Sequence, residues 1–324
     1  LKEPEDFWIV ELGAGRGLLC RDVLRGLRRD APRCLSRTTF AAVERSPGRL
    51  EDFREGLDSE PEAAAWRDRI RRARSLEEVP PGVSGVVFSN EWFDALPVHR
   101  VCPMGGVLKE VYVRAAEGRF TEELGEPSTP ALDAHFQALG LRPPEGDGRG
   151  RAEVNLMAAE RMEAIGRTLE RGFVLTLDYG YPAGELYSPA RVAGGGTLMC
   201  YHRHRAHSNP YIQVGEQDLT AHVDFTSLVA AGRRAGLEPV GFTDQHHFLV
   251  GLGIAQEALP VPAGGSAGAI RALHRNLAIK NLLLPGGLGG TLKVLIQQKG
   301  AAAGEAQTLS GLRSAVFKVS DLSA

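Results

Sequence analysis

The chain has no surplus of charge of either sign and no long apolar run. Its 38 Lys and Arg nearly cancel its 40 Asp and Glu, so the net charge of the 324 residues is −2. Nucleic acid, which attracts strongly basic surfaces, is therefore not an expected partner. The longest apolar run, Phe248 to Ala255, holds eight residues, whereas a membrane-spanning helix needs about 20. We expect no membrane span.

Cysteine is also scarce, with four residues in the chain and none of them in a C-x-x-C pair. This spacing favours neither a zinc ribbon nor a thioredoxin-type site and is typical of free thiols in a reducing compartment. With 43% hydrophobic and 24% charged residues, the composition is that of an ordinary globular protein. The chain begins at Leu1 with no leader-like segment, so we expect a missing front that would have carried any targeting signal.

Strands and helices are predicted to alternate over the first 90 residues. Short apolar runs at residues 7–12, 38–43 and 85–89 predict buried strands, and residues 18–29 have helical spacing. A second helix is expected to begin at Pro47. This alternation predicts an α/β fold with a parallel sheet.

A different pattern follows from residue 98 onward, where residues 107–113 and 117–120 predict a hairpin. We expect an insertion at about 98–150 within a single domain of residues 1–300, followed by a loose tail at 301–324. The other predicted elements are an amphipathic helix at 154–169, a buried strand at 173–178, a helix at 224–235 and strands at 239–242 and 292–297. Residues 179–222 are expected to form a long structureless connection with a functional role.

A glycine-rich segment, ELGAGRG at residues 11–17, joins the first predicted strand to the first predicted helix. Glycines let the backbone pass close to a ligand, and a helix N-terminus offers free N–H groups. A dinucleotide-binding G-x-G-x-x-G would need glycine where Leu18 stands. The G-x-G-x-G spacing resembles motif I of class I S-adenosylmethionine methyltransferases. Glu44 ends the second strand, where its carboxylate can accept both ribose hydroxyls; a glycine turn beside an ordinary surface acid is the alternative.

The string SNEWFDALPVH at residues 89–99 resembles a signature of the MidA family of S-adenosylmethionine-dependent methyltransferases. That family includes mitochondrial methyltransferases that assist the assembly of respiratory complex I. Further strings agree in order, namely LDYG at 177–180, GTL at 196–198, DLTAHVDF at 218–225 and LKVL at 292–295. The resemblance covers about residues 7–300.

The resemblance implies a Rossmann-like class I methyltransferase fold, with a mostly parallel seven-stranded sheet and helices on both faces. It implies S-adenosylmethionine as cofactor and, as substrate, an arginine of a partner protein such as a respiratory-complex subunit. The expected cofactor-binding residues are Glu11, Gly13, Gly15, Gly17, Glu44 and Asn90.

Glu91, Asp94 and His222 are the expected catalytic residues. Glu91 and Asp94 end a strand three residues apart, and paired carboxylates can hold a guanidinium by two hydrogen bonds. The alternatives are that Asp94 caps a short helix beginning at Ala95 and that Glu91 merely packs beside Asn90. His222 is alternatively a buried, hydrogen-bonded histidine.

Substrate binding is expected at Asp178, Tyr179, His204 and Asp224, of which Asp224 also suits the N-cap of a helix. No metal is expected at the H-x-H-x-x-H spacing of residues 202–207, because arginines interleave it and no carboxylate or cysteine completes it. There is also no G-x-S-x-G elbow and no P-loop lysine.

Two other functions stay open: an assembly factor that keeps the cofactor fold with little turnover, and a methyltransferase of small molecules. A homodimer is left open as well. The expected location is the cytoplasm if the chain is bacterial and the mitochondrial matrix if it is eukaryotic.

Overall fold

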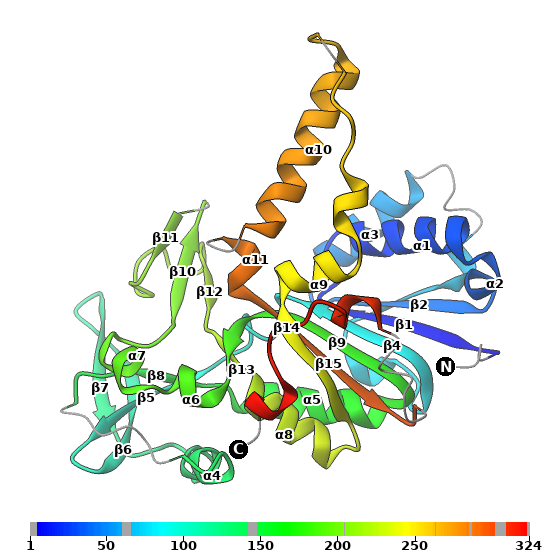
Figure 1. The fold of residues 1–324 in the computed structure, drawn as a ribbon. Coiled ribbons are helices and arrows are strands. Elements are labelled where there is room, and N and C mark those ends of the chain that lie inside the picture. Colours follow the sequence, from blue (N-terminus) through cyan, green and yellow to red (C-terminus); the bar gives the residue numbers. More distant parts are fainter. Residues whose placement is uncertain are drawn as a thin grey trace. The chain divides into compact units, whose positions relative to one another are not determined.

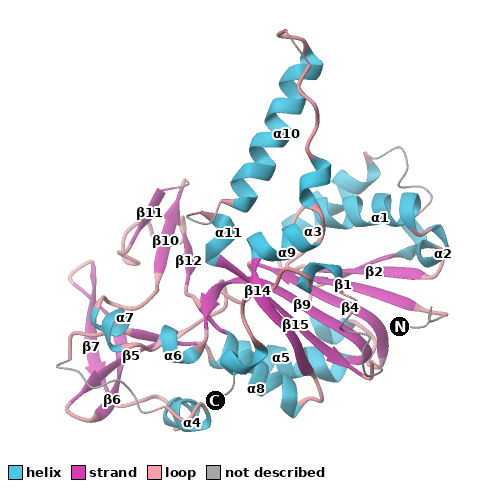
Figure 2. Cartoon of the chain, in the orientation of Figure 1, coloured by secondary structure: helices cyan, strands magenta, loops and turns pink. Residues whose placement is uncertain are grey.

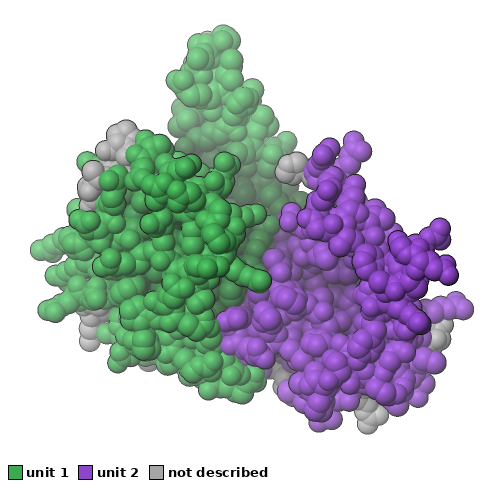
Figure 3. Space-filling model, turned by 180° about the vertical axis from the view of Figure 1, so that it is seen from behind, with its two compact units in different colours: residues 1–92, 163–177, 232–319 green, residues 93–162, 178–231, 320–324 purple. Residues whose placement is uncertain are grey.

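The computed structural model describes residues 5–59, 66–141, 148–203, 205–262, 264–284, 287–301 and 309–322. The chain divides into two compact units (Figure 3). Unit 1 holds residues 1–92, 163–177 and 232–319, and unit 2 holds residues 93–162, 178–231 and 320–324. The prediction of one domain over residues 1–300 with an insertion at 98–150 stays a prediction.

Unit 1 is built on a mixed, mostly parallel sheet with the strand order β14-β15-β9-β4-β1-β2-β3. The strands are β1 (Phe7–Leu12), β2 (Thr38–Val43), β3 (Ile70–Ala73), β4 (Val83–Asn90), β9 (Leu169–Tyr181), β14 (Glu238–Asp244) and β15 (Leu292–Lys299). β1 lies between β2 and β4 and is parallel to both, and β4 is parallel to β9. β14 and β15 are antiparallel. The predicted α/β fold with a seven-stranded path is confirmed.

Helices α1 (Leu18–Asp30), α2 (Pro32–Leu35) and α3 (Pro47–Asp58) follow β1 and β2. α1 and α3 cover one face of the sheet through Cys20, Leu24 and Phe53, which pack with Phe40 of β2 (Figures 1 and 2). The Ser46 hydroxyl accepts a hydrogen bond from the Arg49 N–H and so caps α3. This packing leaves the carboxyl ends of β1, β2 and β4 at one edge of the sheet, where open α/β sheets bind their ligands.

Helices α9 (Gln245–Gly251), α10 (Ala267–Leu283) and α11 (Leu288–Thr291) complete unit 1. Phe248 of α9 packs against Val294 and Ile296 of β15. The expected loose tail is wrong for residues 309–319, because the Phe317 ring packs against the Phe242 ring at a tilt of 38°, with centroids 5.6 Å apart. Leu312 packs directly on Gly241, since a Cβ added to Gly241 would lie 2.4 Å from the Leu312 side chain.

Unit 2 contains two small sheets and several short helices. The first sheet has the order β7-β6-β5-β8, with β5 (His99–Met104), β6 (Val107–Ala116), β7 (Arg119–Gly125) and β8 (Ala152–Val154). The second has the order β11-β10-β12, with β10 (Met199–His202), β11 (Arg205–His207) and β12 (Asp218–Thr220). β13 (Val223–Asp224) pairs with the end of β9 at Gly180 and Tyr181. The predicted hairpin is confirmed as β6 and β7.

The helices of this part of the chain are α4 (Ala131–Ala138), α5 (Leu156–Thr168), α6 (Ala183–Leu186), α7 (Pro189–Ala193) and α8 (Phe225–Arg234). The amphipathic helix predicted at 154–169 and the helix predicted at 224–235 are therefore confirmed. The structureless connection expected at 179–222 is wrong, because helices α6 and α7 and strands β10 to β12 lie within it.

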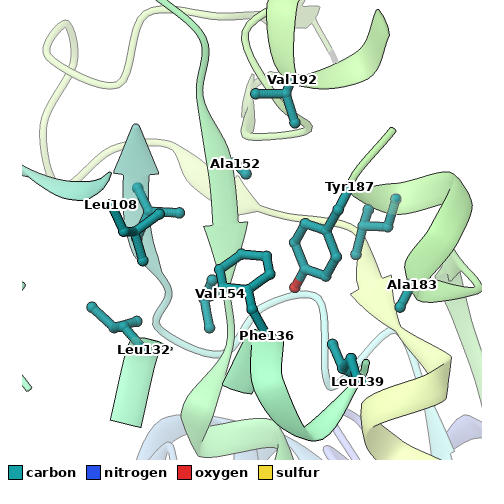
Figure 4. Packing of buried hydrophobic residues seen from close by; sticks show 11 residues of the cluster. Leu108, Leu132, Phe136, Leu139, Ala152, Val154, Ala183, Tyr187 and Val192 are labelled. Carbon is teal, nitrogen blue, oxygen red and sulfur yellow. The ribbon is translucent and has the colours of Figure 1, made fainter. Parts of the chain in front are cut away.

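The core of unit 2 gathers around Phe136 and Tyr187 (Figure 4). Their rings meet edge to face with centroids 5.0 Å apart, a favourable aromatic geometry. Beside this core, Glu122 of β7 binds the guanidinium groups of Arg100 and Arg151 and accepts a hydrogen bond from the Tyr211 hydroxyl at 2.9 Å. These contacts attach the loop around Tyr211 to the hairpin.

All four cysteines, Cys20, Cys34, Cys102 and Cys200, carry free thiols, as their spacing predicted. None of the helices in the described part of the chain is long and apolar enough to span a membrane.

Candidate cofactor and substrate sites

The glycine loop connects β1 to α1 and is fastened to the end of β2. The N–H groups of Gly13 and Ala14 both donate to the Val43 carbonyl, at 2.8 and 3.2 Å. Gly13, Gly15 and Gly17 have φ angles of 73, 53 and 75°, in the left-handed region that glycine enters without steric cost. The loop therefore needs glycine at these positions to turn from strand into helix.

The Glu44 carboxylate lies against this loop from the end of β2. Its Oε2 accepts a hydrogen bond from the Gly15 N–H at 3.1 Å, and its Oε1 accepts one from the Ser46 N–H at 2.9 Å. A carboxylate has about four acceptor positions, so each oxygen keeps one for a further donor. The arrangement fixes a half-buried acid where two hydroxyl groups of a ligand can reach it.

The glycine loop and the beginning of the SNEWFDALPVH string meet at Trp92. A Cβ on Gly13 would lie 2.9 Å from Trp92 Cδ1, so the indole occupies the space that a larger residue would need. Next to this contact is a cavity of about 370 Å³, lined among others by Glu11, Gly13, Leu18 and Asn90. A second cavity of about 380 Å³ is lined by Leu18 and by Phe53 of α3. Such volumes are within the range of small-molecule sites.

Glu11 contributes a buried carboxylate to the first cavity. The side chain is 7% exposed, and Oε2 has no hydrogen-bond partner among the described residues. Burial raises the pKa of Glu11 from 4.5 to about 7, because a carboxylate loses hydration on leaving water. An unsatisfied buried acid of this kind suits a ligand that brings a positive charge or a hydrogen-bond donor.

The raised pKa of Glu11 predicts a pH-dependent stability. The unfolded chain releases this proton near pH 4.5 and the folded chain near pH 7, so the folded state binds the extra proton between them. The free energy of unfolding should then fall as pH rises through this window, by about 3 kcal/mol in total. We expect Glu11→Gln to remove this fall.

The measurement is the free energy of unfolding in urea, for the wild-type chain and for Glu11→Gln, between pH 4.5 and 8. The difference between the two proteins isolates Glu11 from the other titrating groups. Parallel pH profiles for the two proteins would contradict the assignment.

Glu91 directly follows β4 and has a strained backbone. Its φ angle is 47°, a region that non-glycine residues enter at a cost of about 1–2 kcal/mol. The Glu91 N–H donates to the Leu177 carbonyl at 2.9 Å, and its Oε1 accepts from Asn90 Nδ2 at 3.3 Å. The exposed carboxylate is thus held at the carboxyl end of β4, and such strain is common at functional positions.

In unit 2, the fully buried Asp178 organises the chain around Phe93. Its Oδ2 accepts from the Phe93 N–H and its Oδ1 from the Tyr179 N–H, both at 2.9 Å. The neighbouring Asp94 is buried, and its carbonyl accepts from the Ala221 N–H at 3.0 Å. No helix begins at Ala95, where the chain forms a turn, so the alternative of a helix cap is wrong for Asp94.

His222 belongs to a cluster of rings at the end of β9. Its ring lies nearly parallel to Tyr179, with centroids 6.5 Å apart, and 5.3 Å from the Tyr181 ring. The Arg191 guanidinium lies 4.0 Å above the Tyr181 ring, a cation–π contact. The backbone N–H of His222 donates to the Thr197 hydroxyl at 3.0 Å. The half-buried cluster thus packs against the guanidinium of Arg191.

Asp224 lies deeper in unit 2 and caps α8. Its Oδ1 accepts from the Ser227 N–H at 3.0 Å and its Oδ2 from the Ser227 hydroxyl at 2.6 Å. Burial raises its pKa to about 6, and burial lowers the pKa of His135, 3.6 Å from Oδ2, to about 4. The capping role is present as the sequence suggested, and a substrate role for Asp224 stays a prediction.

The expected site residues thus form two groups. Unit 1 brings together the predicted cofactor-binding residues and Glu91, and unit 2 holds Asp94, Asp178, Tyr179, His222 and Asp224. His204 lies outside the described residues. Among the residues that are described, no three His, Cys, Asp or Glu side chains form a group suited to a metal ion.

Sequence patterns missed two aromatic residues, Trp92 and Tyr181. Trp92 stands inside the SNEWFDALPVH string, and its position next to the strand end was the available signal. Tyr181 follows Tyr179 by two residues on one strand, so the two rings project to the same side.

The comparison with protein families finds a match over residues 1–243 to the family described as "Putative S-adenosyl-L-methionine-dependent methyltransferase". The protein arginine methyltransferase NDUFAF7 homolog, mitochondrial, of Drosophila melanogaster is 31% identical over 68% of this chain and 52% of its own length. Protein arginine methyltransferase NDUFAF7, mitochondrial, of Homo sapiens is 27% identical over 76% of this chain and 56% of its own. The chain spans about half the length of these curated relatives.

Among solved structures, a protein from Burkholderia thailandensis bound to S-adenosyl-homocysteine superposes with a TM-score of 0.80. The two sequences are 27% identical, and the match covers 97% of this chain and 76% of the other. A native crystal structure of a protein from the same organism gives 0.80 at 29% identity, covering 97% and 79%.

Proposed function

Because the chain belongs to the family of S-adenosyl-L-methionine-dependent methyltransferases, we propose that it transfers a methyl group from S-adenosylmethionine to an arginine of a partner protein. The observation that carries the cofactor part is the Glu44 carboxylate, held by the N–H groups of Gly15 and Ser46 at the end of β2. The names of the relatives support the arginine part.

The residues of unit 1 fit this cofactor. The two acceptor positions left on Glu44 suit the ribose hydroxyls, and the open side of Gly15 lets a ligand approach the backbone, since a Cβ there would meet nothing nearer than Gly13 O at 3.9 Å. The unpartnered Oε2 of Glu11 suits the positive charge of the amino-acid part. When bound, the cofactor supplies a methyl group activated by a sulfonium.

We assign Glu91 the role of holding the substrate guanidinium. Its exposed carboxylate can accept charge-assisted hydrogen bonds from two guanidinium nitrogens, which fixes the orientation of the remaining nitrogen. Orientation of this kind supplies much of the rate in a displacement at a methyl carbon. The roles of Asp94 and His222 in catalysis, and of Asp178 and Tyr179 in substrate binding, are part of the same proposal.

For the location, we propose a reducing compartment, namely the cytoplasm of a bacterium or the mitochondrial matrix. The four free cysteines support a reducing compartment, and the mitochondrial relatives support the matrix.

The test is a methylation assay with S-adenosylmethionine that carries a deuterated methyl group. The acceptors are arginine-containing peptides and a peptide set in which lysine replaces each arginine. We expect labelled methylarginine with the wild-type chain, detected by mass spectrometry, and about 100-fold less or lower still with Glu91→Gln. Label on lysine, or no transfer by a chain that binds the cofactor, would contradict the proposal. The last outcome would favour an assembly factor.

A further inference from the structure

The GTL string at residues 196–198 lies in unit 2, directly before β10. Its threonine is bound by a buried carboxylate. Glu153 Oε2 accepts one hydrogen bond from the Thr197 N–H at 2.7 Å and another from the Thr197 hydroxyl at 3.0 Å. Glu153 is 5% exposed, and hydrogen bonds are stronger in such surroundings than in water. Glu153 therefore sets the orientation of the Thr197 hydroxyl.

The glycine of the string makes room for this carboxylate. Gly196 has a φ of +85°, and a Cβ there would lie 2.5 Å from both carboxylate oxygens of Glu153. The neighbouring Gly195 has a φ of +99°, but a Cβ there would meet nothing within 4 Å. The second oxygen of the carboxylate, Oε1, lies 3.6 Å from Arg100 Nε, and this cation offsets part of the cost of a buried negative charge. Glycine at 196 thus lets Glu153 reach the threonine.

The Thr197 hydroxyl connects Glu153 to the backbone of His222. A hydroxyl has one donor and two acceptor positions. Because its proton goes to Glu153, its lone pairs are left for other donors, and one of them accepts the backbone N–H of His222 at 3.0 Å. The preceding N–H, that of Ala221, donates to the Asp94 carbonyl at 3.0 Å. Two successive N–H groups are thus bound to residues distant in the sequence.

These two bonds hold a short segment that belongs to no strand or helix. Residues 221 and 222 lie between β12 and β13, so the ladders of those strands do not include them. The His222 ring lies beside the rings of Tyr179 and Tyr181. The place of the imidazole therefore depends on the hydrogen bonds of its own backbone and of its neighbour.

We propose that Glu153 and Thr197 are positioning residues for methyl transfer, because they fix the backbone of His222 and with it the place of the imidazole. This role rests on the proposed function, in which Asp94 and His222 act on the substrate arginine. Both residues act through His222. Without the hydroxyl the segment can shift, and a displacement of about 1 Å can cost about 100-fold in rate.

The test measures kcat and KM of the full chain with S-adenosylmethionine and an arginine-containing peptide. Thr197→Val removes the hydroxyl and keeps the shape of the side chain, whereas Thr197→Ser keeps the hydroxyl. Thr129→Val is the matched control, because the Thr129 hydroxyl of unit 2 also accepts a backbone N–H, that of Ala131 at 3.2 Å. Urea unfolding of each variant measures the accompanying change in stability.

A pair of glycine variants perturbs the carboxylate instead of the hydroxyl. Gly196→Ala displaces the Glu153 side chain, whereas Gly195→Ala places a Cβ at a similar positive φ without touching it. We expect Gly196→Ala to lower kcat as Thr197→Val does, and Gly195→Ala to retain it.

For Thr197→Val we expect kcat to fall about 10- to 100-fold, with KM for S-adenosylmethionine unchanged because the proposed cofactor residues belong to unit 1. Thr197→Ser and Thr129→Val should keep kcat within about threefold of the wild type, since both leave the bond to His222 in place. Equal kcat values for Thr197→Val and Thr129→Val, or a loss in Thr197→Ser as large as in Thr197→Val, would overturn the positioning role alone. No transfer by a wild-type chain that binds the cofactor would contradict the proposed function and this role with it.

Discussion

Replacing Glu91 with glutamine is expected to lower the rate of methyl transfer by about 100-fold or more, within the range for removal of a positioned catalytic carboxylate. The substitution keeps the size of the side chain, removes its negative charge and leaves one accepting oxygen in place of two, so it removes the two-point ion pair proposed for the guanidinium. Turnover with a peptide acceptor, measured beside urea unfolding, separates this effect from instability. Unchanged turnover would contradict the assignment.

The backbone of Glu91 allows a sharper version of this experiment. Because φ is 47°, Glu91→Gly relieves strain of about 1–2 kcal/mol and increases the freedom of the unfolded chain by somewhat less. We expect the free energy of unfolding to stay equal or rise while activity is lost. Glu117, with φ 51° in the turn between β6 and β7, offers the matched control. Glu117→Gly should show the same effect on stability and retain activity.

Replacing Gly15 with alanine is expected to weaken binding of S-adenosylhomocysteine by about 5- to 150-fold. The new methyl group meets no protein atom within 3.9 Å, so it extends into the space proposed for the cofactor. Inserting one methyl group into a filled site costs about 1–3 kcal/mol, which corresponds to this range of affinity. Titration calorimetry measures the change directly.

Gly105 provides the control for the backbone contribution. It has φ +59°, close to the +53° of Gly15, and a Cβ there meets nothing within 4 Å. Gly105→Ala should therefore cost about as much stability as Gly15→Ala, about 1–2 kcal/mol, with cofactor affinity unchanged. Equal losses of affinity in both variants would assign the effect to general destabilisation.

Much of unit 1 was predictable because its signals are local. The strands at residues 7–12 and 38–43 have the predicted bounds, since buried parallel strands are short apolar runs closed by glycine or a polar residue. The glycine loop and Glu44 were predictable as well. Each directly follows a predicted strand, and the carboxyl ends of parallel strands in one sheet meet at the same edge.

The remaining elements lack such local signals. β10, β11 and β12 have four, three and three residues, too few to show a periodicity, so residues 179–222 were expected to be structureless. No element was predicted at α10, because its apolar residues lie on two sides of the helix and form no single stripe. The contact of Trp92 with Gly13 depends on tertiary packing between residues far apart in the sequence.

The most direct test of the central claim is a calorimetric titration of S-adenosylhomocysteine into the chain and into Glu44→Ala. At pH 8, Glu11 is mostly ionised, given its pKa of about 7. The site described above predicts one molecule bound per chain and a loss of affinity of at least about tenfold in the variant, equivalent to about 1.4 kcal/mol. No binding by the wild-type chain, or equal binding by both proteins, would contradict a cofactor site at Glu44 and the glycine loop.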